Sequence, residues 1–408
     1  MRILAIETSC DETALALLEC SGNVESPIIQ PISQALYSQV KEHAPFGGVF
    51  PALAKREHIK NIVPLFLECL EKGAMLKKGS NQLDEEKIAT IRKMLEHEGV
   101  LANFFIEHIV PLERPAIDAI AVTRGPGLEP ALWVGVNFAK ALSYLWDMPI
   151  VPTNHMEGHI ASVLVNEGAA EIRYPALALL ASGGHTELVL IDKPLSYRRI
   201  GQTRDDAVGE AFDKVARLLG LPYPGGPQIS KLAAQVRERI SNKSASNPHE
   251  PNIKFPRPMV NSDDYDFSYA GLKTAVLYKI QELGELTDEL RERIAYEFEE
   301  AATDVLISKT KKALATAFGG VPPEAGKASM PQVLIVGGGV IANMYLRERL
   351  VNLAAEAGVI LMLPARELST DNAIMIGAAA YLHLTAGETY ESYSPTGKML
   401  EANGTLRL

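Results

Sequence analysis

The sequence has few cysteines and no long apolar run. Its 408 residues include only 3 cysteines, Cys10, Cys20 and Cys69, which are too few for a disulfide framework and fit a reducing cytoplasm. No stretch reaches the roughly 18 consecutive apolar residues of a transmembrane helix. The opening residues, 1–7, predict a strand that runs into polar residues and not a signal peptide. We therefore expect a cytoplasmic protein that is not associated with a membrane.

Positive charge is also scarce. Lys and Arg number 40 against 50 Asp and Glu, which gives a formal net charge of −10. A protein that binds nucleic acid by itself is usually basic, so any contact with RNA needs a local basic patch or a partner. Three stretches offer such a patch, although each is more often a solvated helix face: 55–60, 77–78 and 347–349.

What the sequence does contain is a large apolar fraction and a repeated strand pattern. Hydrophobic residues make up 47% of a chain that is long enough for two domains. Two segments, 2–19 and 176–191, each read as a strand, a turn of small or polar residues, and a second strand. A later buried strand, 333–336, ends in three glycines at 337–339. The backbone N–H groups of such turns can bind phosphate.

Any one of these turns is ordinary, but all three in this order favour a nucleotide-binding protein. They predict an α/β fold of two related, RNase H-like lobes with a nucleotide cleft between them. This is the plan of the actin, Hsp70 and sugar-kinase ATPases, although a fold alone does not name a reaction. Helices are expected at 131–146, 205–220, 285–318 and 372–387, the last capped by Thr370 or Asp371.

The domain organisation follows from these elements. We predict an N-terminal α/β lobe at 1–151, a C-terminal α/β lobe at 152–385 that contains the nucleotide cleft and a helix with a candidate metal-binding motif at 154–159, and a tail at 386–408 that packs back on the first lobe. A charged, helix-prone insertion is expected at about 76–113, and surface loops are expected at 239–252 and 319–331.

The most specific short motif is Asn154-His155-Met156-Glu157-Gly158-His159. On a helix the two histidines, four residues apart, present their imidazoles on one face and can bind one divalent metal. Zinc proteases use His-Glu-x-x-His, with the general base directly after the first histidine. Here Glu157 is displaced by roughly 100° around the helix, which weakens a protease interpretation. A helix that carries two surface histidines is the simpler alternative.

Long motifs in a fixed order extend this interpretation over nearly the whole chain. The chain resembles the tRNA N6-adenosine threonylcarbamoyltransferase family in its bacterial and organellar form, formerly called O-sialoglycoprotein endopeptidases or glycoproteases. The resemblance is carried by residues 6–13, 125–128, 154–159, 182–186, 205–214, 223–227, 266–274, 338–343 and 370–372.

The resemblance implies which residues bind which ligand. It places one divalent metal, iron before zinc, on His155, His159 and Asp371, although Asp371 alone suggests only a helix cap. It places the nucleotide part of the substrate on eight residues: Leu180, Ala181, Ser182, Gly183, Gly184, Asp213, Gly226 and Asn343. For Asp213, an ion pair with Lys214 or Arg217 is the simpler alternative role.

The implied reaction is transfer of a threonylcarbamoyl group from threonylcarbamoyl-AMP to N6 of the adenosine 3′ to the anticodon, in tRNAs that read codons beginning with A. AMP is released, and the metal polarises the carbamoyl carbonyl. Asp11 and Glu12 are candidates to assist proton removal, or they only stabilise their turn. Cys10 has no evident base and receives no role as nucleophile.

The resemblance also implies partners: a shorter paralogue that lacks the metal site, and a small P-loop ATPase. Ala52 departs from the family pattern, which has glutamate there, and the insertion at about 76–113 is absent from shorter members. Two other functions stay open on the sequence, a metalloprotease and a non-catalytic ATP-binding scaffold.

Overall fold

The chain forms two compact units in the computed structural model. The structure describes residues 1–79, 85–165, 172–242, 253–317, 331–395, 397 and 400–408. Unit 1 comprises Met1–His43, Val49–Ile172 and Pro364–Leu408, and unit 2 comprises Ala44–Gly48 and Arg173–Leu363. Unit 1 therefore includes the segment around His155 and the helix after Asp371. The boundaries at 151/152 and 385/386 stay predictions from the sequence.

The sheet of unit 1 has five strands in the order β3-β2-β1-β4-β5. Strands β1, β2 and β3 form an antiparallel meander, and β1, β4 and β5 run parallel. Residues 2–19, predicted as a hairpin, supply β1 and most of β2. The strands span Arg2–Glu7 (β1), Glu12–Gly22 (β2), Pro27–Ser38 (β3), Ala119–Gly125 (β4) and Ile150–Asn154 (β5).

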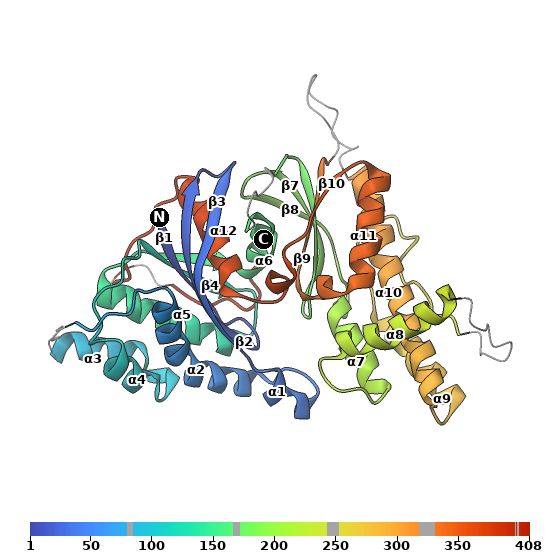
Figure 1. Cartoon of the computed structure of the whole chain (residues 1–408), viewed down its shortest axis with the longest axis horizontal. Helices are drawn as coiled ribbons and strands as arrows, with labels where there is room; N and C mark the ends of the chain where they lie inside the picture. The colour runs from blue at the N-terminus through green and yellow to red at the C-terminus, as the bar shows by residue number, and fades with distance from the viewer. Residues whose placement is uncertain (80–84, 166–171, 243–252, 318–330, 396, 398–399) are drawn as a thin grey trace, which may run out of the picture. The chain divides into compact units, whose positions relative to one another are not determined.

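Helices bury both faces of this sheet (Figure 1). Successive side chains of a strand point to opposite faces, so Leu4 and Ile6 of β1 join the core under α2 and α5, while Ala5 packs towards α12. This arrangement explains why the centres of the two strands, residues 3–6 and 14–18, are apolar at every position. The helices of unit 1 are α1 (Val40–His43), α2 (Pro51–Lys72), α3 (Glu85–Met94), α4 (Leu101–His108), α5 (Glu129–Trp146), α6 (His155–Ala161) and α12 (Ala373–Thr385).

Unit 2 repeats the topology of unit 1. Its sheet has the order β10-β9-β6-β7-β8, with an antiparallel meander β6-β7-β8 and parallel strands β6, β9 and β10. This repeat confirms the predicted α/β fold of two related lobes. The strands span Ala176–Ala181 (β6), Thr186–Lys193 (β7), Ser196–Gln202 (β8), Val333–Gly337 (β9) and Ile360–Met362 (β10).

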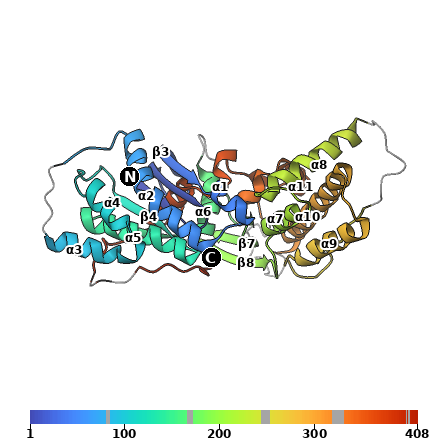
Figure 2. The same ribbon diagram turned by 90° about the horizontal axis from the view of Figure 1, so that it is seen from below.

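The helices of unit 2 include a layer in which α10 packs against α8, α9 and α11 (Figure 2). Their apolar faces and the sheet share one core, which contains Phe212, Phe298 and Val305. The helices span Val208–Leu218 (α7), Gly225–Ser241 (α8), Ala270–Leu283 (α9), Asp288–Thr316 (α10) and Met344–Ala357 (α11). Short 3₁₀ turns lie at Ala44–Phe46 (η1) and Gly339–Ala342 (η4) in unit 2, and at Glu96–Glu98 (η2), Ser162–Leu164 (η3) and Arg366–Leu368 (η5) in unit 1.

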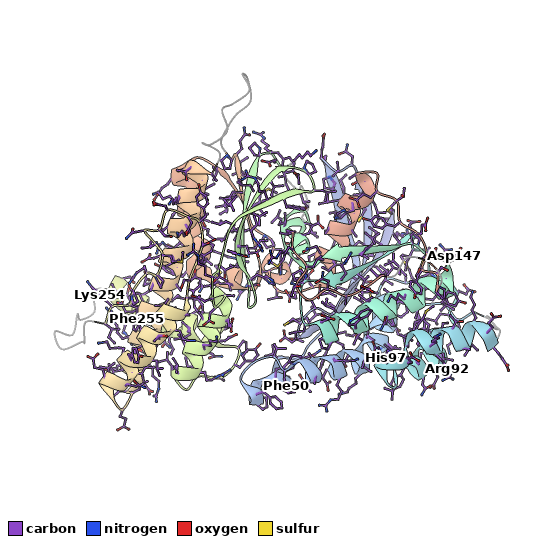
Figure 3. All side chains as sticks on the ribbon, turned by 180° about the vertical axis from the view of Figure 1, so that it is seen from behind. Phe50, Arg92, His97, Asp147, Lys254 and Phe255 are labelled. Carbon is purple, nitrogen blue, oxygen red and sulfur yellow. The ribbon has the colours of Figure 1, made fainter. Side chains whose placement is uncertain are left out.

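The predicted insertion at about 76–113 is built into unit 1. It forms α3, η2 and α4, and Figure 3 marks Arg92 and His97 on it. Its apolar residues Ile91 and Phe105 are fully buried in the core of the unit. Residues 80–84 of the insertion lie outside the described residues, as do residues 243–252 and 319–330 of the two predicted surface loops.

The C-terminal tail returns to the sheet of unit 1. The backbone carbonyl of Glu391 accepts a hydrogen bond from the backbone N–H of Ile150 at 3.2 Å, and the backbone N–H of Asn403 donates one to the carbonyl of Arg124 at 2.7 Å. The tail thus contacts β5 and the end of β4. Throughout the described chain, we find no helix whose length and apolar character would let it span a membrane.

Candidate metal centre and nucleotide-binding residues

Helix α6 begins at His155 because the preceding residue caps it. The side-chain oxygen of Asn154 accepts hydrogen bonds from the backbone N–H groups of Met156, at 2.8 Å, and Glu157, at 3.4 Å. His155 and His159 lie one turn apart, and their ring centroids are 4.8 Å from each other. The structure therefore places the two imidazoles side by side on one short helix.

Asp371 lies at the other end of unit 1 in sequence but beside these histidines in space. Its Oδ1 is 3.4 Å from Nε2 of His155 and 3.2 Å from Nε2 of His159. The expectation that Thr370 or Asp371 caps α12 was wrong, because Asn372 supplies the cap. This cap leaves the Asp371 carboxylate free to face the two imidazoles.

A buried carboxylate orients the first imidazole from behind. Nδ1 of His155 lies 3.1 Å from Oε2 of Glu7 and 3.2 Å from the hydroxyl of Ser9. The hydroxyl of Thr123 donates to the same Glu7 oxygen at 2.6 Å. A carboxylate or hydroxyl behind a histidine in this way fixes the ring and turns Nε2 towards a metal.

These charges shift each other's protonation. Burial lowers the pKa of His155, but the carboxylates of Asp371 and Glu7 outweigh it and raise this pKa well above its ordinary value. Burial raises the pKa of Glu7 and of Asp371, but the neighbouring imidazole outweighs it and holds the pKa of both carboxyls below their ordinary values. In the absence of a cation, a charged imidazolium is thus the group that balances the two acids.

His159 shows that this group fits a metal. Its side chain is fully buried, and its Nδ1 makes no hydrogen bond to any residue that the structure describes, while its Nε2 lies 3.2 Å from Oδ1 of Asp371 without hydrogen-bond geometry. A buried imidazole without a hydrogen-bond partner is costly. One ligand atom from each of His155, His159 and Asp371 lies within 4.8 Å of the others. Two imidazole nitrogens and one carboxylate oxygen suit a divalent transition metal and leave coordination positions for a substrate.

The candidate acids follow β1: Asp11 lies in the turn after Ser9, and Glu12 is the first residue of β2. Burial raises the pKa of Asp11, and the charge of Asp371 adds to this effect. Burial, followed by the charges of Asp11 and Asp371, raises the pKa of Glu12 well above its ordinary value. Burial also raises the pKa of the Cys10 thiol, which keeps it protonated and argues against a nucleophile. This segment therefore brings two carboxyls of raised pKa within electrostatic reach of Asp371.

In unit 2, the predicted nucleotide-binding segment 180–184 runs from the end of β6 into the turn before β7. Ser182 closes this turn, because its hydroxyl accepts a hydrogen bond from the backbone N–H of His185 at 3.1 Å. A Cβ added to Gly183 or Gly184 would meet no atom within 4 Å, so both glycines face open space. Leu180 and Ala181, by contrast, are fully buried in β6.

Two glycines outside that segment let other chain segments approach it. A Cβ at Gly209 of α7 would lie 2.7 Å from the carbonyl oxygen of Ser182, and a Cβ at Gly338 would lie 2.4 Å from that of Ala181. Gly338 also has a φ of +96°, a conformation that side chains disfavour. The turns after the parallel strands β6 and β9 therefore meet at the carboxyl end of the sheet, where α/β proteins bind ligands.

Asp213 and Gly226 lie on either side of the turn between α7 and α8. Oδ1 of Asp213 accepts a hydrogen bond from the backbone N–H of Gly225 at 2.7 Å and so holds the start of α8. Gly226, the next residue, faces open space. Lys214 pairs instead with Asp206, at 2.7 Å, and with Glu210.

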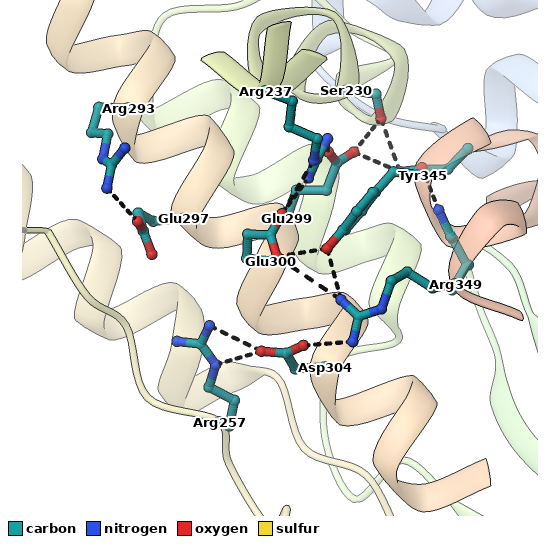
Figure 4. A network of polar contacts seen from close by, with 12 residues as sticks. Ser230, Arg237, Arg257, Arg293, Glu297, Glu299, Glu300, Asp304, Tyr345 and Arg349 are labelled. Atoms are coloured by element: carbon teal, nitrogen blue, oxygen red, sulfur yellow. Dashed lines mark hydrogen bonds and ion pairs between the residues drawn. The ribbon is translucent and has the colours of Figure 1, made fainter. Parts of the chain in front are cut away.

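Asn343 lies between η4 and α11, and both ends of its side chain are engaged. Its oxygen caps α11, and its amide nitrogen donates to Glu299 at 2.6 Å and to Ser230 at 3.0 Å. Glu299 is fully buried and also accepts a hydrogen bond from Arg237 at 2.6 Å (Figure 4). Since both amide hydrogens are used, Asn343 offers a ligand only its remaining acceptor capacity.

Comparison with known proteins shows the family of the chain. A family model described as tRNA N6-adenosine threonylcarbamoyltransferase matches residues 30–80 and 104–378. A protein of that name from Staphylococcus haemolyticus is 38% identical over 388 residues, which cover 95% of this chain and 92% of the relative. Another, from Nitrosospira multiformis, is 39% identical over 392 residues and covers 96% and 94% of the two chains. The chain belongs to the tRNA N6-adenosine threonylcarbamoyltransferase family.

Solved structures resemble the chain more distantly. Component A of (R)-2-hydroxyglutaryl-CoA dehydratase from Acidaminococcus fermentans superposes with a TM-score of 0.43 at 10% identity, and the match covers 95% of this chain and 99% of that one. The family assignment rests on the sequence relatives.

The family model leaves residues 81–103 unmatched, within the predicted insertion. Glu98 of this segment is 1% exposed and anchors it, because its carboxylate accepts a hydrogen bond from Asn137 at 2.8 Å and pairs with Lys55 at 3.3 Å. This family member therefore uses its extra segment to extend the core of unit 1.

Sequence reasoning missed two buried groups that hold the β1–β2 turn. Glu7 directly follows the apolar run 3–6 of β1, and this position is the signal that it is a buried acid. His58 is fully buried in α2, where its Nε2 donates to the carbonyl of Cys10 at 3.0 Å. Its Nδ1 accepts from the hydroxyl of Thr13 at 2.7 Å and from the amide of Gln39 at 3.3 Å. Because a carbonyl can only accept, these contacts fix the neutral tautomer of His58.

Proposed function

We propose that this protein transfers a threonylcarbamoyl group from threonylcarbamoyl-AMP to N6 of the adenosine 3′ to the anticodon, in tRNAs that read codons beginning with A. The observation that carries the proposal is the group of His155, His159 and Asp371 in a member of this family. In the reaction the N6 amine forms a bond to the carbamoyl carbon, the bond from that carbon to the phosphate oxygen breaks, AMP leaves, and N6 loses one proton.

The three residues would hold one divalent metal, with Fe²⁺ preferred over Zn²⁺. When bound, the metal supplies Lewis acidity that polarises the carbamoyl carbonyl. Glu7 and Ser9 keep the His155 ring in place, and Asp371 balances the charge of the site.

Asp11 and Glu12 are the candidate catalytic residues for the proton. Their turn joins β1 to β2 directly after Ser9, which contacts His155, so the acids are near the proposed reaction. A weakly nucleophilic exocyclic amine needs a positioned proton acceptor and a fixed orientation. We assign the acceptor role to these two carboxyls, and neither the Cys10 thiol nor Glu157 takes part.

The nucleotide part of the substrate is assigned to the carboxyl end of the unit 2 sheet. The segment from Leu180 to Gly184 and Gly226 would contact the nucleotide through their backbone groups, because Gly183, Gly184 and Gly226 face open space. Asp213 offers a carboxylate oxygen to ribose hydroxyls, and Asn343 contributes by its remaining acceptor capacity.

The acidic chain is proposed to work in the cytoplasm with partners: a shorter paralogue without the metal site, and a small P-loop ATPase. Its net charge of −10 favours help in binding tRNA. The contact between Glu157 and His383, at 2.8 Å, disfavours a metalloprotease, because the carboxylate is already engaged. No contact of the described residues favours the non-catalytic scaffold.

Radiolabelled threonine tests the proposal. The assay contains the enzyme that makes threonylcarbamoyl-AMP, both partners, and a tRNA that reads codons beginning with A, and it compares the unaltered chain with His155→Ala. We expect metal-dependent labelling of tRNA that His155→Ala abolishes. Labelling that His155→Ala leaves unchanged would remove the metal mechanism, and no labelling with all components present would refute the proposed function.

A further inference from the structure

Glu157 lies between the two histidines in sequence but faces away from them. It is 4% exposed, and its Oε2 contacts Nε2 of His383, on α12, at 2.8 Å. On a helix Glu157 is roughly 200° around the axis from His155, so the two side chains leave opposite sides of α6. The carboxylate is thus turned towards α12 and not towards the metal centre.

His383 is held from both of its ring nitrogens. Its Nδ1 contacts Oε1 of Glu388 at 2.9 Å, and the hydroxyl of Tyr390 donates to the other oxygen of Glu388 at 2.6 Å. Only an imidazolium can donate from both nitrogens to two carboxylates. Burial lowers the pKa of His383, but Glu157 and Glu388 outweigh it and raise this pKa to about 9. The ring is therefore charged at neutral pH and bridges two acids.

The bridge joins the two elements that supply the metal ligands. Helix α6 carries His155 and His159, and α12 begins two residues after Asp371. The helices also pack closely at Gly158, where an added Cβ would lie 3.0 Å from Cδ1 of Ile376. A helix of 7 residues has little stability of its own, so contacts of this kind decide its rotation.

We propose that Glu157 and His383 are positioning residues for the metal centre: their ion pair fixes the rotation of α6 against α12, and so holds both imidazoles towards Asp371. The inference rests on the proposed metal site. It gives the glutamate of the His-x-Glu-x-His motif a purpose that needs no proton transfer to substrate. It also explains why this carboxylate is buried although it lies outside the group of metal ligands.

Metal affinity tests the proposal without any transferase assay. The affinity of the full chain for Zn²⁺ is measured by competition with a chromophoric chelator, and the absorption bands of bound Co²⁺ report ligand geometry. Glu157→Ala and His383→Ala each should weaken Zn²⁺ binding by about 10-fold or more, the size seen when a group that orients a ligand is lost. Glu157→Gln keeps a hydrogen bond to His383 and should lose less.

Glu388→Gln is the matched control. It removes a charge from the same cluster, but this side chain is 49% exposed and binds Nδ1 of His383, whereas Glu157 of α6 binds Nε2. We expect it to leave Zn²⁺ affinity and the Co²⁺ spectrum nearly unchanged. Urea unfolding with excess chelator measures the stability of each metal-free variant, and His383→Ala serves if Glu157→Ala does not fold.

The outcomes separate the alternatives. Weaker metal binding with an altered Co²⁺ spectrum supports the positioning role, even if tRNA labelling fails and the proposed function falls. A variant that is less stable but binds Zn²⁺ as tightly as the unaltered chain shows a merely structural pair and overturns the role. Unchanged metal binding together with lost transferase activity shows that Glu157 acts in the chemistry, and this also overturns it. An unaltered chain that binds no metal refutes both the site and the inference.

Discussion

His58 should make unit 1 sensitive to acid. The fold holds its imidazole neutral, since Nε2 donates to the carbonyl of Cys10 while Nδ1 accepts from Thr13 and Gln39. Protonation of Nδ1 would place a proton where two donors already point. Burial lowers the pKa of His58 from 6.5 to about 4, although the carbonyl of Cys10 opposes this change.

The sign and size of the effect follow from linkage. Because the pKa is lower in the folded chain than in the unfolded chain, the stabilisation is fully present above pH 6.5 and is lost as the pH falls towards 4. Between pH 7.5 and pH 5, one group with these two values removes about 2 kcal/mol of unfolding free energy. A loss of this size is a large part of the stability of an ordinary domain.

The assay can be confined to unit 1. The chain has 2 tryptophans, Trp133 and Trp146, and both lie on α5. Urea unfolding followed by their fluorescence therefore reports this unit, which matters because a chain of two units need not unfold in one step. His58→Gln lacks the titrating group, so we expect its disadvantage at pH 7.5 to shrink by about 2 kcal/mol at pH 5.

The control is His97→Gln, whose side chain is 81% exposed. It should follow the unaltered chain at both pH values. If His58→Gln and the unaltered chain lose stability in parallel between pH 7.5 and pH 5, then His58 is not held neutral by the fold and the reasoning fails.

Three further outcomes follow from the contacts. His159→Ala should reduce bound metal, measured by elemental analysis, from one per chain to nearly none, whereas His97→Ala should leave it unchanged. Asn343→Ala removes a helix cap and one donor to buried Glu299, so hydrogen exchange in α11 should show a loss of about 2 to 4 kcal/mol, and unchanged exchange would contradict this. Glu98→Ala leaves Asn137 and Lys55 without their buried partner and should lower the unfolding free energy of unit 1 by about 2 to 3 kcal/mol, measured by tryptophan fluorescence, whereas replacement of its exposed neighbour, Glu96→Ala, should not.

Much of the fold was predictable because its strands can be recognised from local sequence patterns. The hairpins at 2–19 and 176–191 are apolar on both faces, as strands under two helix layers must be, and they became β1–β2 and β6–β7. The insertion was harder. Its charge and helix propensity predicted a helical insertion, but not that Ile91 and Phe105 are buried in the core, because the sequence does not show which face of an isolated helix packs against a partner.

The candidate site was predictable where spacing carries it. His155 and His159 belong to one helix turn, so sequence alone places their imidazoles together. Asp371, Glu7 and His383 are distant in sequence from the two histidines, and local sequence patterns do not predict such long-range contacts. His58 was missed for a different reason: it sits among charged residues, yet it shares the buried face of α2 with Ile62. Helical periodicity was the signal for it.

The order of the segments in unit 1 has a consequence for synthesis of the protein. Unit 2, at 173–363, interrupts unit 1 in the chain, so Asp371 is translated after it and His159 before it. At about 5 to 20 residues per second, the ribosome needs roughly 10 to 40 seconds to go from the second histidine to the aspartate. A nascent or prematurely ended chain thus carries two of the three ligands and cannot complete the centre. Tight metal binding becomes a mark of a finished polypeptide.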